Sequence, residues 1–176
     1  MKMYRILLIF SAITLVCSVA EARLDEKTQQ TVNEICKQTI DTKFCRAVFV
    51  KNLMTSSPSK NDLLNVTVTE AERFSGNTCF FISTLLRNAG DERADLQMCA
   101  EAYAIVDTAF TKALSFFSQG LYDKILNLEE NVSNGIGICK TDFSVSGYEI
   151  NPLIEKNRET MVLMAMEKIV GHMASS

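Results

Sequence analysis

An apolar stripe at helical spacing is the feature that most limits what this 176-residue chain can fold into. Side chains at such intervals lie on one face of an α-helix. The stripe predicts a helix of about five turns, because a helix has 3.6 residues per turn. Its members recur at intervals of 4, 3, 4, 3 and 4 residues: Cys99, Tyr103, Val106, Phe110, Ala113 and Phe117.

A second stripe predicts another long helix earlier in the chain. We expect Asn61 or Asp62 as its N-cap and an end near Arg87. Gly76 should weaken this helix by about 1 kcal/mol relative to alanine. A charged turn at residues 88–95 then makes the two long helices antiparallel neighbours. The stripe comprises Leu64, Val68, Ala71, Ser75, Thr78, Ile82 and Leu85, widened by Phe74 and Phe81.

Two further patterns favour helices in the second half of the chain. We expect a third helix from Leu121 to Val132, ended by Gly135 and Gly137. Residues 141–151 are expected to form a loop, and Pro152 stands where the last helix can begin. That last helix carries an apolar stripe: Val162, Met166, Ile169 and Met173.

Together these patterns predict an all-α fold. Four long amphipathic helices with mostly short connections are typical of an up-and-down four-helix bundle. Proline and glycine are scarce, and no segment alternates as a strand does. Residues 25–56 form an extra helical segment before the bundle. The length suits one domain with a sizeable core.

The N-terminus has the pattern of a secretory signal peptide. Lys2 and Arg5 precede an apolar run at residues 6–20, and Ala20-Glu21-Ala22 provides a small-x-small cleavage site. The run is shorter than a membrane-spanning helix, although an N-terminal anchor is the alternative reading. We therefore expect residues 1–22 to be removed, leaving a secreted protein without a membrane segment.

Cysteine usage fits that compartment. After Cys17 leaves with the signal peptide, five cysteines remain: Cys36, Cys45, Cys79, Cys99 and Cys139. Disulfides are the default in an oxidising compartment, and an odd number leaves one thiol free or intermolecular. Two sequons make Asn65 and Asn131 candidate N-glycosylation sites.

No pattern of a catalytic, cofactor-binding or metal-binding site is present. The single histidine, His172, is close to the C-terminus, and the closest remaining cysteines are nine residues apart rather than paired as zinc ligands are. After signal removal, 16 basic and 20 acidic residues leave a net charge of −4, which argues against a nucleic-acid partner. The sequence favours a protein that binds and uses no cofactor.

Four segments in order resemble the plant invertase and pectin methylesterase inhibitors. They are ICKQTIDTKFC at residues 35–45, the Cys99-x-x-x-Tyr103 helix, GIGICKTDF at 135–143 and NPLIEKNRETMVLMAMEKIV at 151–170. The resemblance implies an N-terminal helical hairpin at 23–57, the four-helix bundle at 58–176, and an apoplastic inhibitor that docks stoichiometrically at an enzyme's active cleft.

The resemblance also implies Cys36–Cys45 and Cys99–Cys139 disulfides, which leaves Cys79 free. In one straight helix Cys36 and Cys45 would lie about 13.5 Å apart, and a disulfide needs about 7 Å, so the chain must turn between them. The rival Cys79–Cys99 pair would be roughly 6 Å out of register across the turn.

The target enzyme is open between two candidates. Gly120-x-Tyr122 looks more like the pectin methylesterase type, and an acid invertase of cell wall or vacuole is the alternative. A third reading is a secreted helical binding, signalling or pollen-type protein without an enzyme target. The sequence leaves the oligomeric state open between a monomer and a dimer. The resemblance places a contact region on the helix after Cys99 and beyond it: Glu101, Asp107, Thr111 and Tyr122.

Overall fold

The computed structural model describes residues 24–145 and 151–175, and side chains are placed in it outside residues 141–150. The predicted signal peptide therefore lies outside the described residues. Within the described ranges the secondary structure is helical, and none of the helices is long and apolar enough to cross a membrane. The helices are α2 (Glu26–Cys36), α3 (Thr42–Asn52), α4 (Lys60–Arg87), α5 (Arg93–Ser118), α6 (Tyr122–Leu126), α7 (Glu129–Val145) and α8 (Ile154–Ser175).

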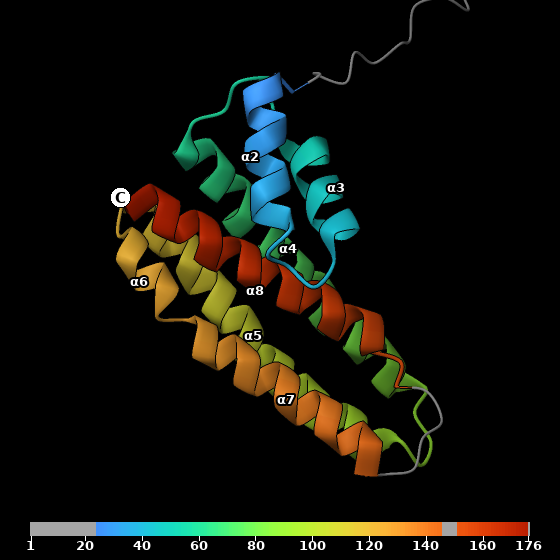
Figure 1. The fold of residues 1–176 in the computed structure, drawn as a ribbon. Coiled ribbons are helices and arrows are strands. Elements are labelled where there is room, and N and C mark those ends of the chain that lie inside the picture. The colour runs from blue at the N-terminus through green and yellow to red at the C-terminus, as the bar shows by residue number, and fades with distance from the viewer. Residues whose placement is uncertain (1–23, 146–150, 176) are drawn as a thin grey trace, which may run out of the picture.

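Four long helices form the bundle that the stripes predict (Figure 1). α5 packs against α4 and α7, and α8 completes the bundle against the same two helices. α2 and α3 stand as an antiparallel pair at one end, where they contact α4 and α8. The expected all-α fold, a four-helix bundle with an N-terminal hairpin extension, is thus confirmed.

α5 buries the apolar stripe that predicted it from the sequence. Cys99, Tyr103, Val106, Phe110 and Ala113 are each at most 1% exposed, and Phe117 packs half-buried against this core. The buried face meets two helices at once, which explains why the apolar stripe is continuous over so many turns.

The N-cap of α4 lies earlier than we predicted. Ser59, rather than Asn61 or Asp62, is the capping residue, and Asp62 is the third helical position of a capping box. The Ser59 backbone N–H donates to Asp62 Oδ2 at 2.8 Å, and the Asp62 N–H donates to Ser59 Oγ at 3.2 Å. Both partners satisfy backbone donors that a helix start leaves free. The predicted end at Arg87 is correct.

The prediction of a single helix from Leu121 to Val132, ended by Gly135 and Gly137, was wrong. A short α6 is followed by α7, which continues through Gly135 and Gly137 to Val145 and so takes in part of the expected loop. The remaining loop positions, 146–150, lie outside the described residues. Gly120 is the glycine that ends a helix, since it has φ of 71° just after α5.

Gly135 has a packing role. A Cβ added there would lie 2.7 Å from Val106 Cγ2 and 2.9 Å from the Ala102 carbonyl oxygen. The missing side chain therefore lets the backbones of α5 and α7 approach closely. The Cys99 and Cys139 Cα atoms, 4.5 Å apart, lie along the same seam.

Gly76 on α4, unlike Gly135, has room for a side chain. It is exposed, and an added Cβ would meet only Asp107 Oδ1, at an ordinary 3.8 Å. We expect Gly76→Ala to raise the free energy of unfolding by about 0.5–1 kcal/mol, because alanine loses less backbone entropy on folding. Urea denaturation followed by circular dichroism measures this, and a loss of stability would contradict it.

Candidate partner-binding surface

Two disulfides fix the parts of the fold that carry the candidate surfaces. Cys36–Cys45 joins the end of α2 to α3 with a Cα–Cα distance of 5.5 Å, and Cys99–Cys139 joins α5 to α7. These are the pairs that the resemblance implied. Each restricts the unfolded chain, and the second closes the longer loop.

The turn between α2 and α3 is held by local hydrogen bonds. Thr39 Oγ1 donates to the Cys36 carbonyl oxygen at 2.8 Å. The Asp41 carboxylate caps α3 by accepting from the Phe44 N–H at 2.9 Å. The bend that the cysteine spacing requires is therefore built from a threonine and an aspartate, as their turn and capping preferences favour.

Arg158 on α8 fastens this turn to the bundle. Its guanidinium pairs with Asp41 of the hairpin and, at 2.6 Å, with Glu155 on its own helix. Asp41 thus both caps α3 and anchors the hairpin. The arginine belongs to the segment at residues 151–170 that carried part of the resemblance.

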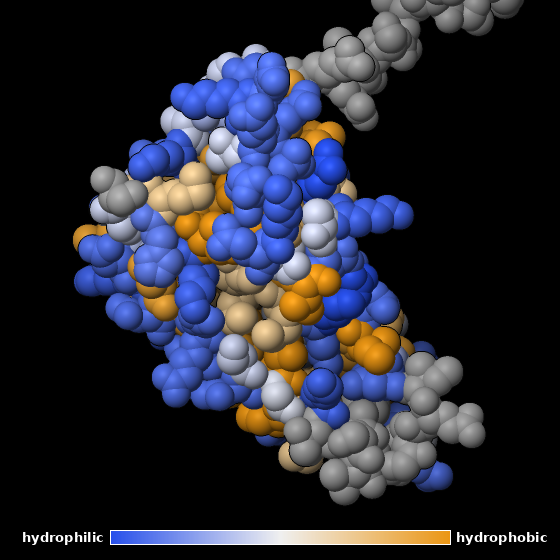
Figure 2. Space-filling view, in the orientation of Figure 1, coloured by the Kyte–Doolittle hydropathy of each residue, from blue (hydrophilic) through white to orange (hydrophobic). Residues whose placement is uncertain are grey.

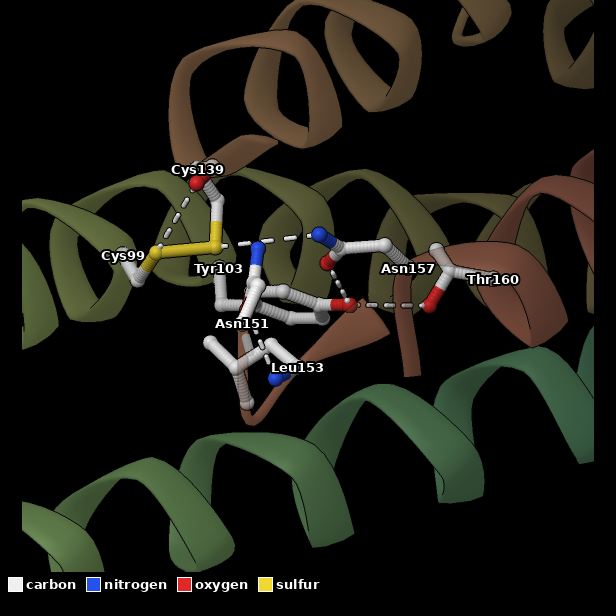
Figure 3. The surroundings of a disulfide bond; sticks show 7 residues. All are labelled: Cys99, Tyr103, Cys139, Asn151, Leu153, Asn157 and Thr160. Atoms are coloured by element: carbon white, nitrogen blue, oxygen red, sulfur yellow. Dashed lines mark hydrogen bonds between the residues drawn. A yellow bond between two sulfur atoms is a disulfide. The ribbon is translucent and has the colours of Figure 1, made fainter. Parts of the chain in front are cut away.

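Asn157 and Tyr103 form a buried polar link beside the second disulfide (Figure 3). The Tyr103 hydroxyl donates to Asn157 Oδ1 at 2.9 Å and lies 3.2 Å from Thr160 Oγ1. Burial raises the pKa of Tyr103, so the phenol stays protonated. Tyr103 therefore orients α8 against α5 and has no exposed surface to offer a partner.

Cys79 is the free thiol of the described chain. It lies half-buried on α4, and its Sγ is 3.6 Å from the Tyr103 carbonyl oxygen. Burial, assisted by the negative charge of Asp107, raises its pKa to about 11. A protonated, half-buried thiol is a poor nucleophile and a poor metal ligand.

We expect Cys79 to react with iodoacetamide at pH 7.5 at least about tenfold more slowly in the folded protein than in urea, because the thiolate is the reacting form. Mass spectrometry of timed samples measures the two rates. Equal rates in both states would show that the thiol is freely accessible, contrary to its placement between α4 and α5.

The four residues expected to contact a partner do not lie together. Glu101 and Thr111 are exposed on α5, but they are about 15 Å apart along the helix at 1.5 Å per residue. Asp107 is half-buried and accepts from Ser75 Oγ of α4 at 2.6 Å. Tyr122 is half-buried at the start of α6, stacked on Phe117 with ring centroids 5.9 Å apart. Asp107 and Tyr122 therefore have structural partners of their own.

A groove that the sequence did not indicate lies where the hairpin turn meets α7 and α8. It has a volume of about 660 Å³ and exposes Ile40 and Ile154 at 71% and 60%. Figure 2 shows apolar surface scattered among hydrophilic side chains on the face that contains α2, α7 and α8. The lining of the groove comprises Ile40, Ser133, Ile136, Gly137, Lys140, Asn151, Ile154, Asn157, Arg158 and Met161.

A family model for plant invertase/pectin methylesterase inhibitors matches residues 30–175, most of the chain. This chain belongs to that inhibitor family. It is therefore a protein of the inhibitor type and not an enzyme, with a protein partner of the pectin methylesterase or invertase kind. The part of the chain that the structure describes also contains no cluster of three or more potential metal ligands.

Solved structures give the same fold. A crystal structure of a pectin methylesterase inhibitor from Arabidopsis thaliana superposes with a TM-score of 0.61 at 14% sequence identity. The match covers 82% of this chain and 95% of that one. No curated protein sequence matches the chain.

Proposed function

We propose that this family member is a secreted inhibitor that binds a pectin methylesterase stoichiometrically at its active cleft. The observation that carries the proposal is the family match over residues 30–175, and the inhibitor from Arabidopsis thaliana supports the esterase as the target. Residues 1–22 then serve as the signal peptide of an apoplastic protein. Two disulfides fit that oxidising compartment.

The scaffold is suited to inhibition by obstruction. Disulfides join α2 to α3 and α5 to α7, an ion pair joins the hairpin to α8, and a buried hydrogen bond joins α5 to α8, so little order has to be gained on binding. A rigid bundle placed over a cleft excludes a polymeric substrate without any chemistry of its own. We also propose that residues 23–57 and 58–176 act as one domain, because Arg158 and the α3–α4 contact join hairpin and bundle.

The exposed side chains of α5 are the proposed contact residues. Glu101 and Thr111 are available to a partner. Asp107 and Tyr122 would contribute only indirectly, through their contacts with Ser75 and Phe117. We expect Thr111→Arg to weaken binding to the esterase by about tenfold or more, since a large charge placed in an interface centre costs well over 1 kcal/mol.

Size-exclusion chromatography of mixtures with purified esterase tests this proposal. Wild type should form a complex at one to one, and Thr111→Arg should form it only at higher concentration. Lys51→Glu on α3 is the matched surface control and should bind as wild type does. If Thr111→Arg formed the complex as wild type does, this face of α5 would lie outside the interface.

An acid invertase is the second candidate target, because the family is described by both enzymes. The same chromatography with invertase distinguishes them. A complex with neither enzyme would favour the third reading, a secreted helical binding, signalling or pollen-type protein without an enzyme target.

A further inference from the structure

The asparagine of a glycosylation sequon lies in a groove between α5 and α7. Asn131 opens the sequence Asn131-Val132-Ser133, and its side chain is exposed near the start of α7. The groove has a volume of about 410 Å³, and its lining comprises Ala104, Ile105, Thr108, Ala109, Lys112 and Asn131. The acceptor therefore lies at the edge of a surface hollow whose opposite wall is α5.

The wall formed by α5 presents an aliphatic patch with polar side chains beside it. Small side chains leave Ile105 accessible, and it is 47% exposed. The C–H face of a pyranose ring can cover such an aliphatic patch and remove it from water. Thr108 and Lys112 stand beside it with a hydroxyl and an ammonium, which can pair with sugar hydroxyls.

The Asn131 side chain is free to carry a substituent. Within the described part of the chain it makes no hydrogen bond, so a bond at its Nδ2 breaks no contact of the fold. The second sequon differs in this respect, because Asn65 Oδ1 accepts from Thr69 Oγ1 at 3.4 Å. Asn65 is exposed too, and it serves below as the matched control.

We propose that Asn131 carries an N-linked glycan whose first sugars lie in the α5–α7 groove over Ile105. The donor is a lipid pyrophosphate-linked oligosaccharide, as in the general secretory modification of such sequons. Asn131 Nδ2 forms a bond to C1 of the first sugar, the bond from C1 to the pyrophosphate oxygen breaks, the amide releases one proton and the lipid pyrophosphate leaves. This site rests on the proposed function only in requiring secretion.

The glycan limits the side from which a protein partner reaches α5. Glu101 is four residues before Ile105 and seven before Thr108, so it lies on the groove side of the helix. Thr111 is three residues after Thr108 and seven after Ala104, so the same spacing places it beside the groove as well. A glycan in the groove therefore borders both proposed contact residues, Glu101 and Thr111, and a partner that contacts them must accommodate it.

Peptide mapping tests the modification. The full chain, including residues 1–22, is expressed in plant cells and collected from the medium. Treatment with a peptide N-glycosidase should convert Asn131 to aspartate, and Asn131→Gln should lack that glycan. Secreted protein with an unmodified Asn131 would overturn the proposal, and so would retention of the wild type inside the cells.

The position of the glycan has its own readout. Labelling of Lys112 by an amine-reactive ester should be several-fold faster in folded Asn131→Gln than in glycosylated wild type, while Lys51 on α3 labels equally in both. Asn65→Gln should label as wild type does. If Asn131→Gln does not fold, wild type treated with the glycosidase replaces it.

Equal labelling of Lys112 with and without the glycan would show that the sugars do not lie in the groove. Concentration-dependent protection of Lys112 in Asn131→Gln would assign the groove to a second copy, and protection by added esterase would assign it to the target. Either result overturns the proposal. None of these readouts requires enzyme inhibition, so the glycan proposal and the proposed function can fail separately.

Discussion

Gly135→Ala is expected to lower the free energy of unfolding by about 2–3 kcal/mol, the upper part of the range for overpacking a core. The new Cβ would lie 2.9 Å from the Ala102 carbonyl oxygen and 2.7 Å from Val106 Cγ2. A side chain can rotate away, but the carbonyl belongs to the backbone of α5. The two helices would therefore have to separate along the seam that Cys99–Cys139 closes.

Gly137→Ala is the matched control on the same helix. Gly137 is exposed, and an added Cβ would have no atom within 4 Å. We expect this variant to be as stable as wild type or more stable by up to about 1 kcal/mol. Urea denaturation of both variants at one pH measures the difference, and equal stability of Gly135→Ala and Gly137→Ala would contradict the close approach of α5 and α7.

Gly135 and Gly137 also show what cannot be predicted from the sequence. Because glycine favours helix ends, the sequence predicts that both glycines end a helix. Only a positive φ makes glycine a terminator, and within the described residues Gly120 alone has one. Whether a helical glycine is needed for close packing depends on the neighbouring helix, and no local pattern contains that information.

Glu167→Gln is expected to abolish a pH dependence of stability and to raise the free energy of unfolding at pH 7 by about 1 kcal/mol or more, because glutamine needs no proton from solvent when it is buried. Glu167 is 5% exposed on α8, and its Oε1 has no hydrogen-bond partner among the described residues. It borders a small cavity lined by Leu126 and Val132, and the charged neighbours there are Glu129 and Lys168.

The direction of the effect follows from burial, which raises the pKa of Glu167 well above 4.5. Above pH 4.5 the unfolded chain releases this proton while the folded protein keeps it, so the folded state binds more protons. Stability is therefore greatest at or below about pH 4.5 and falls as the pH rises toward the folded pKa. Glutamine has no proton to release, so the slope disappears.

Thermal unfolding at pH 4.5 and pH 7 measures this slope for wild type and Glu167→Gln. The two proteins should differ little at pH 4.5, and the variant should be the more stable at pH 7. Glu129→Gln is the control, because Glu129 is a partly exposed partner of Lys168 at 2.8 Å and its loss should change stability by less than about 1 kcal/mol. If Glu167→Gln kept the wild-type dependence of stability on pH, that dependence would belong to another titrating group.

The N-cap carboxylate of α2 and the capping-box carboxylate of α4 make stability depend on pH in the opposite direction. Hydrogen bonds from Ser57 and from the Thr28 backbone lower the pKa of Asp25, and hydrogen bonds from Ser59 lower the pKa of Asp62. What these caps contribute is present above about pH 3.8 and is lost as the pH falls through their folded pKa values. The protein should thus be most stable in mildly acidic solution.

Periodicity predicted α5 and the end of α4 well, because a helix with one buried face repeats its apolar residues at a fixed interval. It did not predict the burial of Glu167, since α8 contacts α4 on one side and α6 and α7 on the other. A helix enclosed in this way buries positions outside its apolar stripe. The same limit applies to Asp107, whose partner Ser75 belongs to another helix.

We propose above that this bundle inhibits a pectin methylesterase by binding it. The most direct measurement is a titration of esterase activity with the purified chain, run beside a titration of acid invertase. We predict that demethylation of pectin falls linearly to near zero at one inhibitor per enzyme, and that sucrose hydrolysis is unchanged. Full esterase activity at a large molar excess of the chain would contradict inhibition of the esterase, and loss of invertase activity alone would assign the inhibitor to the other enzyme.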